Sequence, residues 1–354
     1  VMMDLPEEKT DLVVRWSDNF ERAAILVDSS VYFWQPGQEV MEAAIDYQDV
    51  FFVGQDLYFL AYSEGDPEIT LNRYGWGETV QESISAIPAP KKSGPVFTRV
   101  YPSPDGKYLV LFVAVRPQLT LSEGKFYLID LAVGNFTLVA ESLSAEVAWA
   151  SDSSAFASFG FIYNLDTGKL VSWPPSPTGM SLFWKPDNTL VTILSQQGVG
   201  LAYRRSGEVR TISSNRPLMD AAWLNGSVLT VIPSKGGDSY SRVVDTVMQP
   251  VRVNISERVG SYAITDDAKF ILITGYVDGA NPPASQLYLL NQDSSELVTI
   301  GEGLGVLFNN HLPLSELILL ADQDRNIVVL DTCTLTATPL GINLEGSRVQ
   351  IHWP

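Results

Sequence analysis

Side chains that commonly carry out chemistry are few in this sequence. It contains two histidines, His311 and His352, and one cysteine, Cys333. Neither histidine has another His, Cys or carboxylate at metal-ligand spacing, so we expect both to be structural. A single cysteine excludes an intrachain disulfide and a Cys-based zinc site. Because Cys333 follows an apolar run, we expect a buried, unreactive thiol. We predict no metal site and no cofactor.

The short sequence motifs that mark catalytic or ligand sites are absent or incomplete in this sequence. The segment 237–241, Gly-Asp-Ser-Tyr-Ser, lacks the closing glycine of a nucleophile elbow. No phosphate-binding or dinucleotide-binding glycine loop is found. The segment 322–326 lacks the turn glycine and the later glutamate of a calcium loop, so a hairpin turn explains it better. We therefore predict no catalytic residues in this chain.

Composition limits the class of protein. The chain has 354 residues, of which 45% are hydrophobic, enough to bury a large core. Lys and Arg number 23 against 41 Asp and Glu, a formal net charge of -18. Such an acidic chain repels phosphate backbones, so we expect no nucleic-acid partner. No apolar run approaches the roughly 18 residues of a transmembrane helix, so we expect no transmembrane segment in this chain.

A motif recurs about every forty residues along the whole chain. An apolar anchor ends a strand, a turn follows, and another apolar strand begins; several turns carry an aspartate three residues after the anchor. This regular aspartate indicates a turn device rather than a catalytic acid. The anchors are Trp16, Val53, Pro102, Trp149, Trp184, Trp223, Ile264, Phe308 and Trp353, and the turn aspartates are Asp105, Asp152, Asp187 and Asp267.

A second element, Tyr-x-Leu-Asp or a variant, follows each anchor and opens a turn. Each repeat therefore predicts four strands; in the third repeat they are 97–101, 108–115, 125–130 and 136–140. A period of about 40–45 residues with several short strands is typical of a propeller. We predict an all-β fold, a single β-propeller domain over residues 1–354. Its blades are four-stranded and antiparallel; eight is the expected number and seven the alternative.

The last apolar segment, 348–353, has the character of an inner strand without the three strands that should follow it. Two explanations are open. It pairs with N-terminal strands, or the native chain continues beyond Pro354.

The third repeat carries a family resemblance. Its residues 101–109, Tyr-Pro-Ser-Pro-Asp-Gly-Lys-Tyr-Leu, are followed by Phe126-Tyr-Leu-Ile-Asp-Leu131 and Gly134. This pattern resembles the TolB-like (WD40-like) propeller repeat, and the resemblance extends over nearly the whole chain. It implies the propeller fold and an extracytoplasmic location, although a cytoplasmic one stays open. The matching residues are structural, so they imply no particular activity.

Loop lengths predict which face of a propeller would bind a partner. The turns between the first and second strands are short and alike. The loops between the second and third strands, and between blades, are long and dissimilar. Both long kinds lie on one face of a propeller, and binding residues concentrate in surface loops on rigid scaffolds. The partner-binding candidates are Asp66, Lys91, Lys92, Arg116, Glu123, Lys235, Asp238, Asp278 and Asn281.

Three functions are compatible with these observations. The first, which we favour, is a non-catalytic scaffold or assembly module that binds a protein partner through the long-loop face. The second is an accessory or gating propeller of a larger hydrolase of the serine-peptidase type. The third is a propeller enzyme acting on a sugar or lactone, which would require convergent carboxylates or a metal.

Overall fold

The computed structural model describes residues 12–17, 21–27, 30–37, 40–43, 47, 49–63, 65–74, 81–90, 95–115, 124–142, 144–173, 179–234, 237–265, 267–276, 285–305, 317–322, 324, 326–343 and 349–352. Within these ranges the regular structure is entirely β-strand and forms eight sheets, as predicted. None of the described residues forms a helix long and apolar enough to cross a membrane. By its contacts the chain divides into two compact units: unit 1, Val1–Leu170 with Gly346–Pro354, and unit 2, Val171–Glu345.

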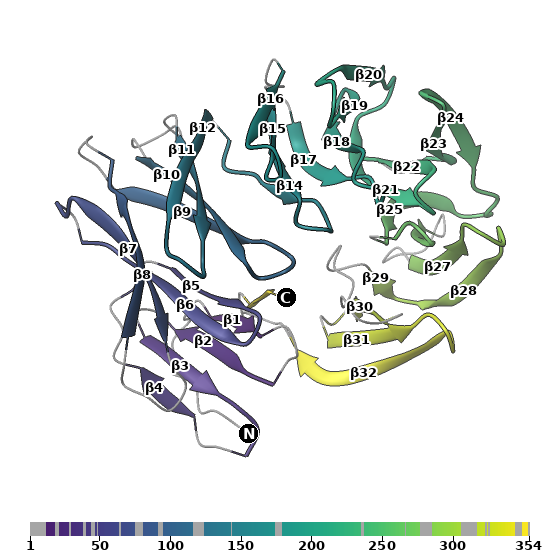
Figure 1. Ribbon diagram of the computed structural model, residues 1–354. Coiled ribbons are helices and arrows are strands. Elements are labelled where there is room, and N and C mark those ends of the chain that lie inside the picture. The colour runs from purple at the N-terminus through teal and green to yellow at the C-terminus, as the bar shows by residue number, and fades with distance from the viewer. Residues whose placement is uncertain are drawn as a thin grey trace. The chain divides into compact units, whose positions relative to one another are not determined.

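Unit 1 holds four sheets, which we number blades 1 to 4 in chain order (Figure 1). Blade 1 consists of β1 (Leu12–Trp16), β2 (Ala23–Val27), β3 (Ser30–Trp34), β4 (Met41–Ala43) and β33 (Val349–His352). Blade 2 consists of β5 (Asp49–Val53), β6 (Asp56–Ala61), β7 (Glu68–Tyr74) and β8 (Gln81–Pro88). Blade 3 consists of β9 (Val96–Pro102), β10 (Tyr108–Val115), β11 (Gly124–Asp130) and β12 (Phe136–Ser142). Blade 4 consists of β13 (Ala148–Trp149), β14 (Ala155–Ser158), β15 (Phe161–Asn164) and β16 (Lys169–Ser172), the last of which crosses the unit boundary.

Unit 2 holds blades 5 to 8, built in the same way. Blade 5 consists of β17 (Gly179–Trp184), β18 (Leu190–Ser195), β19 (Gly198–Tyr203) and β20 (Val209–Ser213). Blade 6 consists of β21 (Leu218–Leu224), β22 (Val228–Pro233), β23 (Ser239–Val244) and β24 (Val247–Arg252). Blade 7 consists of β25 (Arg258–Ile264), β26 (Phe270–Tyr276), β27 (Ser285–Asn291) and β28 (Leu297–Glu302). Blade 8 consists of β29 (Leu304–Gly305), β30 (Leu317–Asp322), β31 (Asn326–Asp331) and β32 (Thr336–Asn343).

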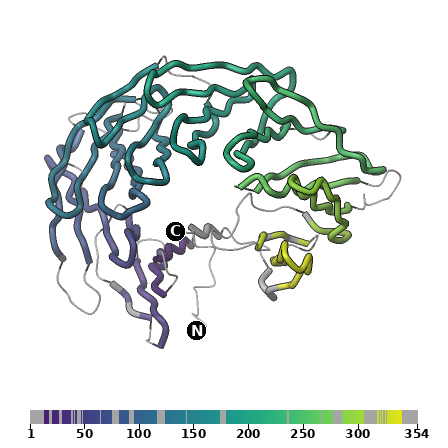
Figure 2. The backbone as a smooth tube through the Cα atoms, turned by 45° about the vertical axis from the view of Figure 1, so that its right-hand side comes forward, coloured from purple at the N-terminus to yellow at the C-terminus, as the bar shows by residue number. Residues whose placement is uncertain are grey.

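Each blade is a meander of hairpins, so consecutive strands are antiparallel neighbours (Figure 2). Blade 1 alone gains a fifth strand, because β33 pairs in parallel with β1 and places Val349 opposite Leu12. Of the two explanations for the last apolar segment, its pairing with an N-terminal strand is therefore observed.

Burial differs between the strands of a blade. In blade 3 the second strand, β10, is buried over seven of its eight residues, whereas the outer strand β12 is largely exposed. These strands agree with the predicted ranges within two residues at each end. The first strand, β9, is half-buried along most of its length.

Adjacent blades within each unit share a hydrophobic cluster. Blades 2 and 3 pack Leu60 and Leu71 in one cluster with Leu109 and Leu111, and blades 6 and 7 do so with Ile232 and Ile273, all fully buried. Comparable clusters join blades 1 and 2, 3 and 4, 5 and 6, and 7 and 8. In blades 2, 3, 6 and 7 the apolar run of the second strand is thus explained by neighbouring sheets that cover both of its faces.

Two tryptophan anchors also join neighbouring blades by hydrogen bonds. The indole of Trp149 in blade 4 donates to the carbonyl of Tyr101 in blade 3 at 2.9 Å. The indole of Trp223 in blade 6 donates to the Thr192 hydroxyl in blade 5, also at 2.9 Å. Large aromatic groups with one polar atom suit such a site, because the ring is buried while its N–H finds an acceptor.

The recurring aspartates are turn devices, as predicted. The Asp105 carboxylate accepts from the Ser103 hydroxyl at 2.7 Å, and Asp267 accepts from the Lys269 amide at 3.0 Å. Asp152 and Asp187 accept in the same way from the residue two positions later. Partial burial would raise the pKa of Asp267, but these hydrogen bonds outweigh it and hold the pKa below its usual range.

The prediction for Cys333 was wrong, because its thiol is exposed. The apolar strand β31 ends at Asp331, whose carboxylate accepts from the Cys333 amide at 2.8 Å. The cysteine therefore lies in a solvent-facing turn rather than in the strand that precedes it.

The Trp223–Thr192 bond gives a direct test of blade-to-blade stabilisation. Changing Trp223→Phe keeps a large ring but leaves the buried Thr192 hydroxyl unpaired, which should lower the free energy of unfolding by about 1–3 kcal/mol. In a cycle with Thr192→Val, measured by urea denaturation, the double variant should lose about 1 kcal/mol less than the sum of the single losses. Strict additivity would show that the bond contributes nothing.

Candidate functional site

The loops between second and third strands lie beside the connections between blades, as the loop-face prediction requires. In blade 2 the amide of Ala89, after the outer strand, donates to the carbonyl of Pro67 in the loop between the second and third strands, at 2.9 Å. In blade 6 the amide of Val253 donates in the same way to the carbonyl of Asp238, at 2.7 Å. The next blade's first strand therefore begins beside this loop.

Two of the nine predicted partner-binding residues belong to the described part of the chain. Asp66 is exposed in unit 1, where its carboxylate accepts from the Ser63 amide at 3.0 Å within its own loop. Asp238 is exposed in unit 2, at the start of β23. The other seven lie outside the described residues: Lys91, Lys92, Arg116, Glu123, Lys235, Asp278 and Asn281.

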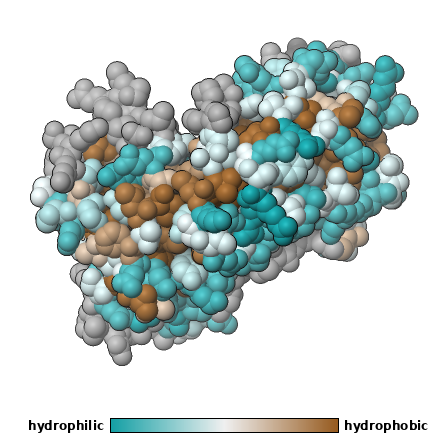
Figure 3. Space-filling view, turned by 45° about the horizontal axis from the view of Figure 1, so that its top comes forward, coloured by the Kyte–Doolittle hydropathy of each residue, from teal (hydrophilic) through white to brown (hydrophobic). Residues whose placement is uncertain are grey.

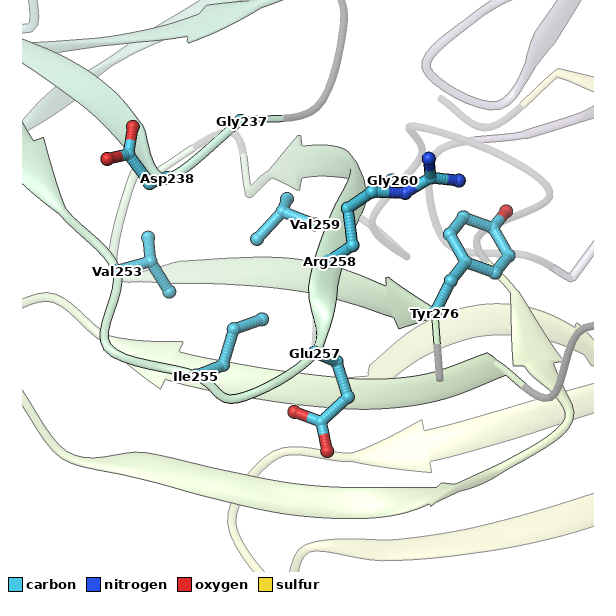
Figure 4. Close-up of a pocket in the computed structure, with 9 residues that line it drawn as sticks. All are labelled: Gly237, Asp238, Val253, Ile255, Glu257, Arg258, Val259, Gly260 and Tyr276. Carbon is cyan, nitrogen blue, oxygen red and sulfur yellow. The ribbon is translucent and has the colours of Figure 1, made fainter. Parts of the chain in front are cut away.

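Asp238 borders a pocket of about 630 Å³ between blades 6 and 7 (Figure 4). Its walls come from the β22–β23 loop, the β24–β25 connection, the start of β25 and the end of β26. The volume falls within the range of about 300–1,000 Å³ that small-ligand sites occupy. The lining residues are Gly237, Asp238, Val253, Ile255, Glu257, Arg258, Val259, Gly260 and Tyr276.

Hydrogen bonds between the blades fix the wall of the pocket. The Tyr262 hydroxyl of blade 7 donates to the carbonyl of Gly237 in blade 6 at 2.6 Å. Burial raises the pKa of Tyr262 to about 12, so this hydroxyl keeps its proton at neutral pH. Arg216 donates to the carbonyl of Ser239 at 3.2 Å from the blade 5–6 connection. The loop that carries Asp238 is thus held from both sides.

Strands β25 and β26 present a polar pair to the pocket. Arg258 and Tyr276 lie directly opposite each other in the antiparallel ladder, so their side chains share one face of the sheet. The Tyr276 ring covers Gly260, where a Cβ atom would lie 1.9 Å from the ring. Glycine at this position therefore makes the room that the tyrosine occupies.

Glu257 makes its contacts on the neighbouring strands. Its side chain packs over Gly275, where a Cβ atom would lie 2.9 Å from the Cβ of Glu257. The hydroxyl of Tyr288 donates to the Glu257 carboxylate, which holds the pKa of that carboxyl below its usual value. Burial and this bond raise the pKa of Tyr288 to about 12. Glu257 is therefore charged at neutral pH and is a poor general acid.

Sequence reasoning found Asp238 but missed the rest of this pocket. The β24–β25 connection is short, so a search for long loops passed over Val253, Ile255 and Arg258. A signal was present in Gly260, because a glycine inside an apolar first strand often marks a close approach by another group.

Exposed apolar side chains occur elsewhere, but among the described residues they are spread over five blades. Figure 3 shows hydrophobic and hydrophilic side chains interleaved over one face of the molecule. The large exposed ones are Val133, Phe136, Leu138, Leu170, Met180, Met219, Val247 and Leu335. The described residues contain no group of three or more His, Cys, Asp or Glu that could hold a metal ion.

Solved structures with a similar course of the chain include the C-terminal WD40 domain of Sif2 and dipeptidyl peptidase 4 of Porphyromonas gingivalis. The first has a TM-score of 0.50 at 12% identity and covers 97% of this chain and 86% of that one. The second has a TM-score of 0.56 at 10% identity and covers 95% of this chain and 60% of that one. The chain folds as a β-propeller.

The structure is also similar to that of the tricorn protease, with a TM-score of 0.47 at 13% identity. This match covers 96% of this chain and 35% of the tricorn protease chain. It thus spans less than two thirds of both peptidase chains. No protein-family model and no curated protein matches the sequence, so the resemblance to the TolB-like family stays a prediction.

Gly260→Ala tests the wall of the pocket. The added methyl group would collide with the Tyr276 ring, and such overpacking should lower the free energy of unfolding by about 1–3 kcal/mol. Gly237→Ala is the matched control, because its methyl group would meet the movable end of the Arg216 side chain. If urea denaturation gives the two variants equal stability, the Tyr276 ring is not fixed against Gly260.

Proposed function

We propose that this propeller is a non-catalytic protein-binding module that uses its long-loop face, with the pocket between blades 6 and 7 as an anchor for one partner residue. The observation that carries the proposal is the pocket's construction. The β22–β23 loop and the β24–β25 connection line it, and the Tyr262–Gly237 bond between blades 7 and 6 holds its wall.

The surroundings of the pocket fit a protein interface. Val253, Ile255 and Val259 form an apolar part, while exposed polar side chains at Arg252, Asn254 and Ser256 flank it. An apolar centre within a polar rim is the usual anatomy of such interfaces. In protein interfaces, a pocket that takes one large side chain of the partner supplies much of the binding energy.

The ionisable groups of the pocket favour binding over catalysis. The described residues that line it include no Ser, Cys or His that could act as a nucleophile or base. Asp238 forms an ion pair with Arg252 at 3.8 Å, and Glu257 accepts from Tyr288. The bond from Tyr288 holds the pKa of Glu257 below its usual value, so this carboxyl is a poor general acid.

A second candidate is an accessory propeller within a larger hydrolase. The observation that favours it is the likeness to dipeptidyl peptidase 4, whose chain extends beyond the part that this chain covers. A likeness of this degree concerns the fold, and function depends on sites rather than on folds. We therefore place this candidate second.

A photo-crosslinking amino acid separates the two candidates in the cells that make this protein. Placed at Ile255, on the long-loop face, it should give a discrete adduct with a partner protein. Placed at Ser206, in an exposed turn between the third and fourth strands of blade 5, it should give none. Equal adducts at both positions, or none at Ile255, would contradict the proposal. A crosslink from Ile255 to a hydrolase domain of the same chain would favour the second candidate.

A further inference from the structure

The pocket has an uneven distribution of charge. Arg258 is exposed at one end and forms no ion pair with any described residue. Its neighbour across the ladder, Tyr276, adds a hydroxyl donor to the same face of the sheet. This end of the pocket therefore offers hydrogen-bond donors and a positive charge.

The two carboxylates of the pocket are directed elsewhere. Asp238 lies at the opposite end in Figure 4, where it pairs with Arg252. Figure 4 also shows the Glu257 carboxylate pointing away from the Arg258 guanidinium. Its Oε2 atom is shielded from solvent, so a ligand in the pocket would not meet it. Neither group neutralises the donor end.

Apolar side chains lie next to the donor end. Val259 follows Arg258 in the chain and is 8% exposed, while Val253 and Ile255 line the same pocket from the β24–β25 connection. A ligand that uses the whole pocket therefore needs an aliphatic group and an anion separated by only a few bonds.

We propose that the pocket binds the C-terminal residue of the partner protein, with an aliphatic side chain against Val253, Ile255 and Val259 and the terminal carboxylate on Arg258 and Tyr276. This inference rests on the proposed function of the pocket. In a C-terminal residue one Cα atom carries both groups, which matches their closeness here. Guanidinium groups recognise carboxylates through paired, charge-assisted hydrogen bonds. An internal acidic residue would bring its carboxylate on a different residue from the aliphatic side chain.

Three small probes test this inference by methyl NMR on the full chain. N-acetyl-leucine carries the side chain and the terminal carboxylate, whereas N-acetyl-leucinamide lacks the carboxylate. N-acetyl-aspartyl-leucinamide carries an internal acid instead. We expect N-acetyl-leucine to shift the methyl signals of Val253, Ile255 and Val259 and to bind about tenfold more tightly than the other two, a typical effect of one charge-assisted contact.

Variants of the donor end complete the test. Arg258→Gln should remove the tenfold preference and leave binding of the amide unchanged, while Arg258→Lys should keep part of it. Arg205→Gln, at an exposed position in blade 5, is the matched control and should keep all of it. Retained methyl dispersion shows that each variant is folded.

The outcomes separate the two proposals. Equal affinity for N-acetyl-leucine and its amide, or a preference that survives Arg258→Gln, overturns the C-terminal inference and leaves the pocket as an anchor. Tighter binding of N-acetyl-aspartyl-leucinamide overturns it in favour of an internal acidic residue. If no probe shifts the pocket methyl groups, the proposed function of the pocket fails together with the inference.

Discussion

The structure depends on apolar burial between neighbouring sheets. The second strand of a blade, such as β10 or β22, carries apolar side chains on both faces of the sheet. These side chains are removed from water only when another blade packs against each face. This burial is the main favourable free energy of folding, and in repeat proteins each unit obtains it from its neighbours. The indole bonds of Trp149 and Trp223 fix how adjacent blades meet.

The same packing determines where chemistry can occur. In blades 3, 4, 5 and 7 the turn between the first and second strands repeats one pattern, in which an aspartate closes it by local hydrogen bonds. The connections on the other face are free to differ, and between blades 6 and 7 they enclose a pocket. The apolar lining of the pocket, Val253, Ile255 and Val259, also belongs to the hydrophobic cluster that joins blades 6 and 7.

The period of the sequence was sufficient to predict the fold. The described anchors lie within one residue of a strand end, with Trp149 ending β13 and Ile264 ending β25. The sequence also predicted the hairpins, because turn residues separate the apolar strands of each repeat. Cys333 shows the limit of this reasoning, because Thr332 directly after β31 is still buried while Cys333 is exposed, and the apolar run gave no sign of where burial ends.

The candidate site was far less predictable. Asp238 was found from loop length, but the pocket arises from residues that approach only after folding, such as Arg258 opposite Tyr276 and Gly237 against Tyr262. Such approaches between strands depend on register and on glycine positions, which composition and periodicity do not report.

Hydrogen–deuterium exchange tests the central claim, that burial between blades rather than pairing within a blade stabilises this protein. Strands β22 and β23 each pair with two neighbours, yet β22 is buried over five of its six residues and β23 over two. If burial decides, amides of β22 exchange more slowly than those of β23, at a rate close to that of global unfolding. Equal protection of the two strands would show that hydrogen bonding within the sheet is sufficient, which would contradict the account.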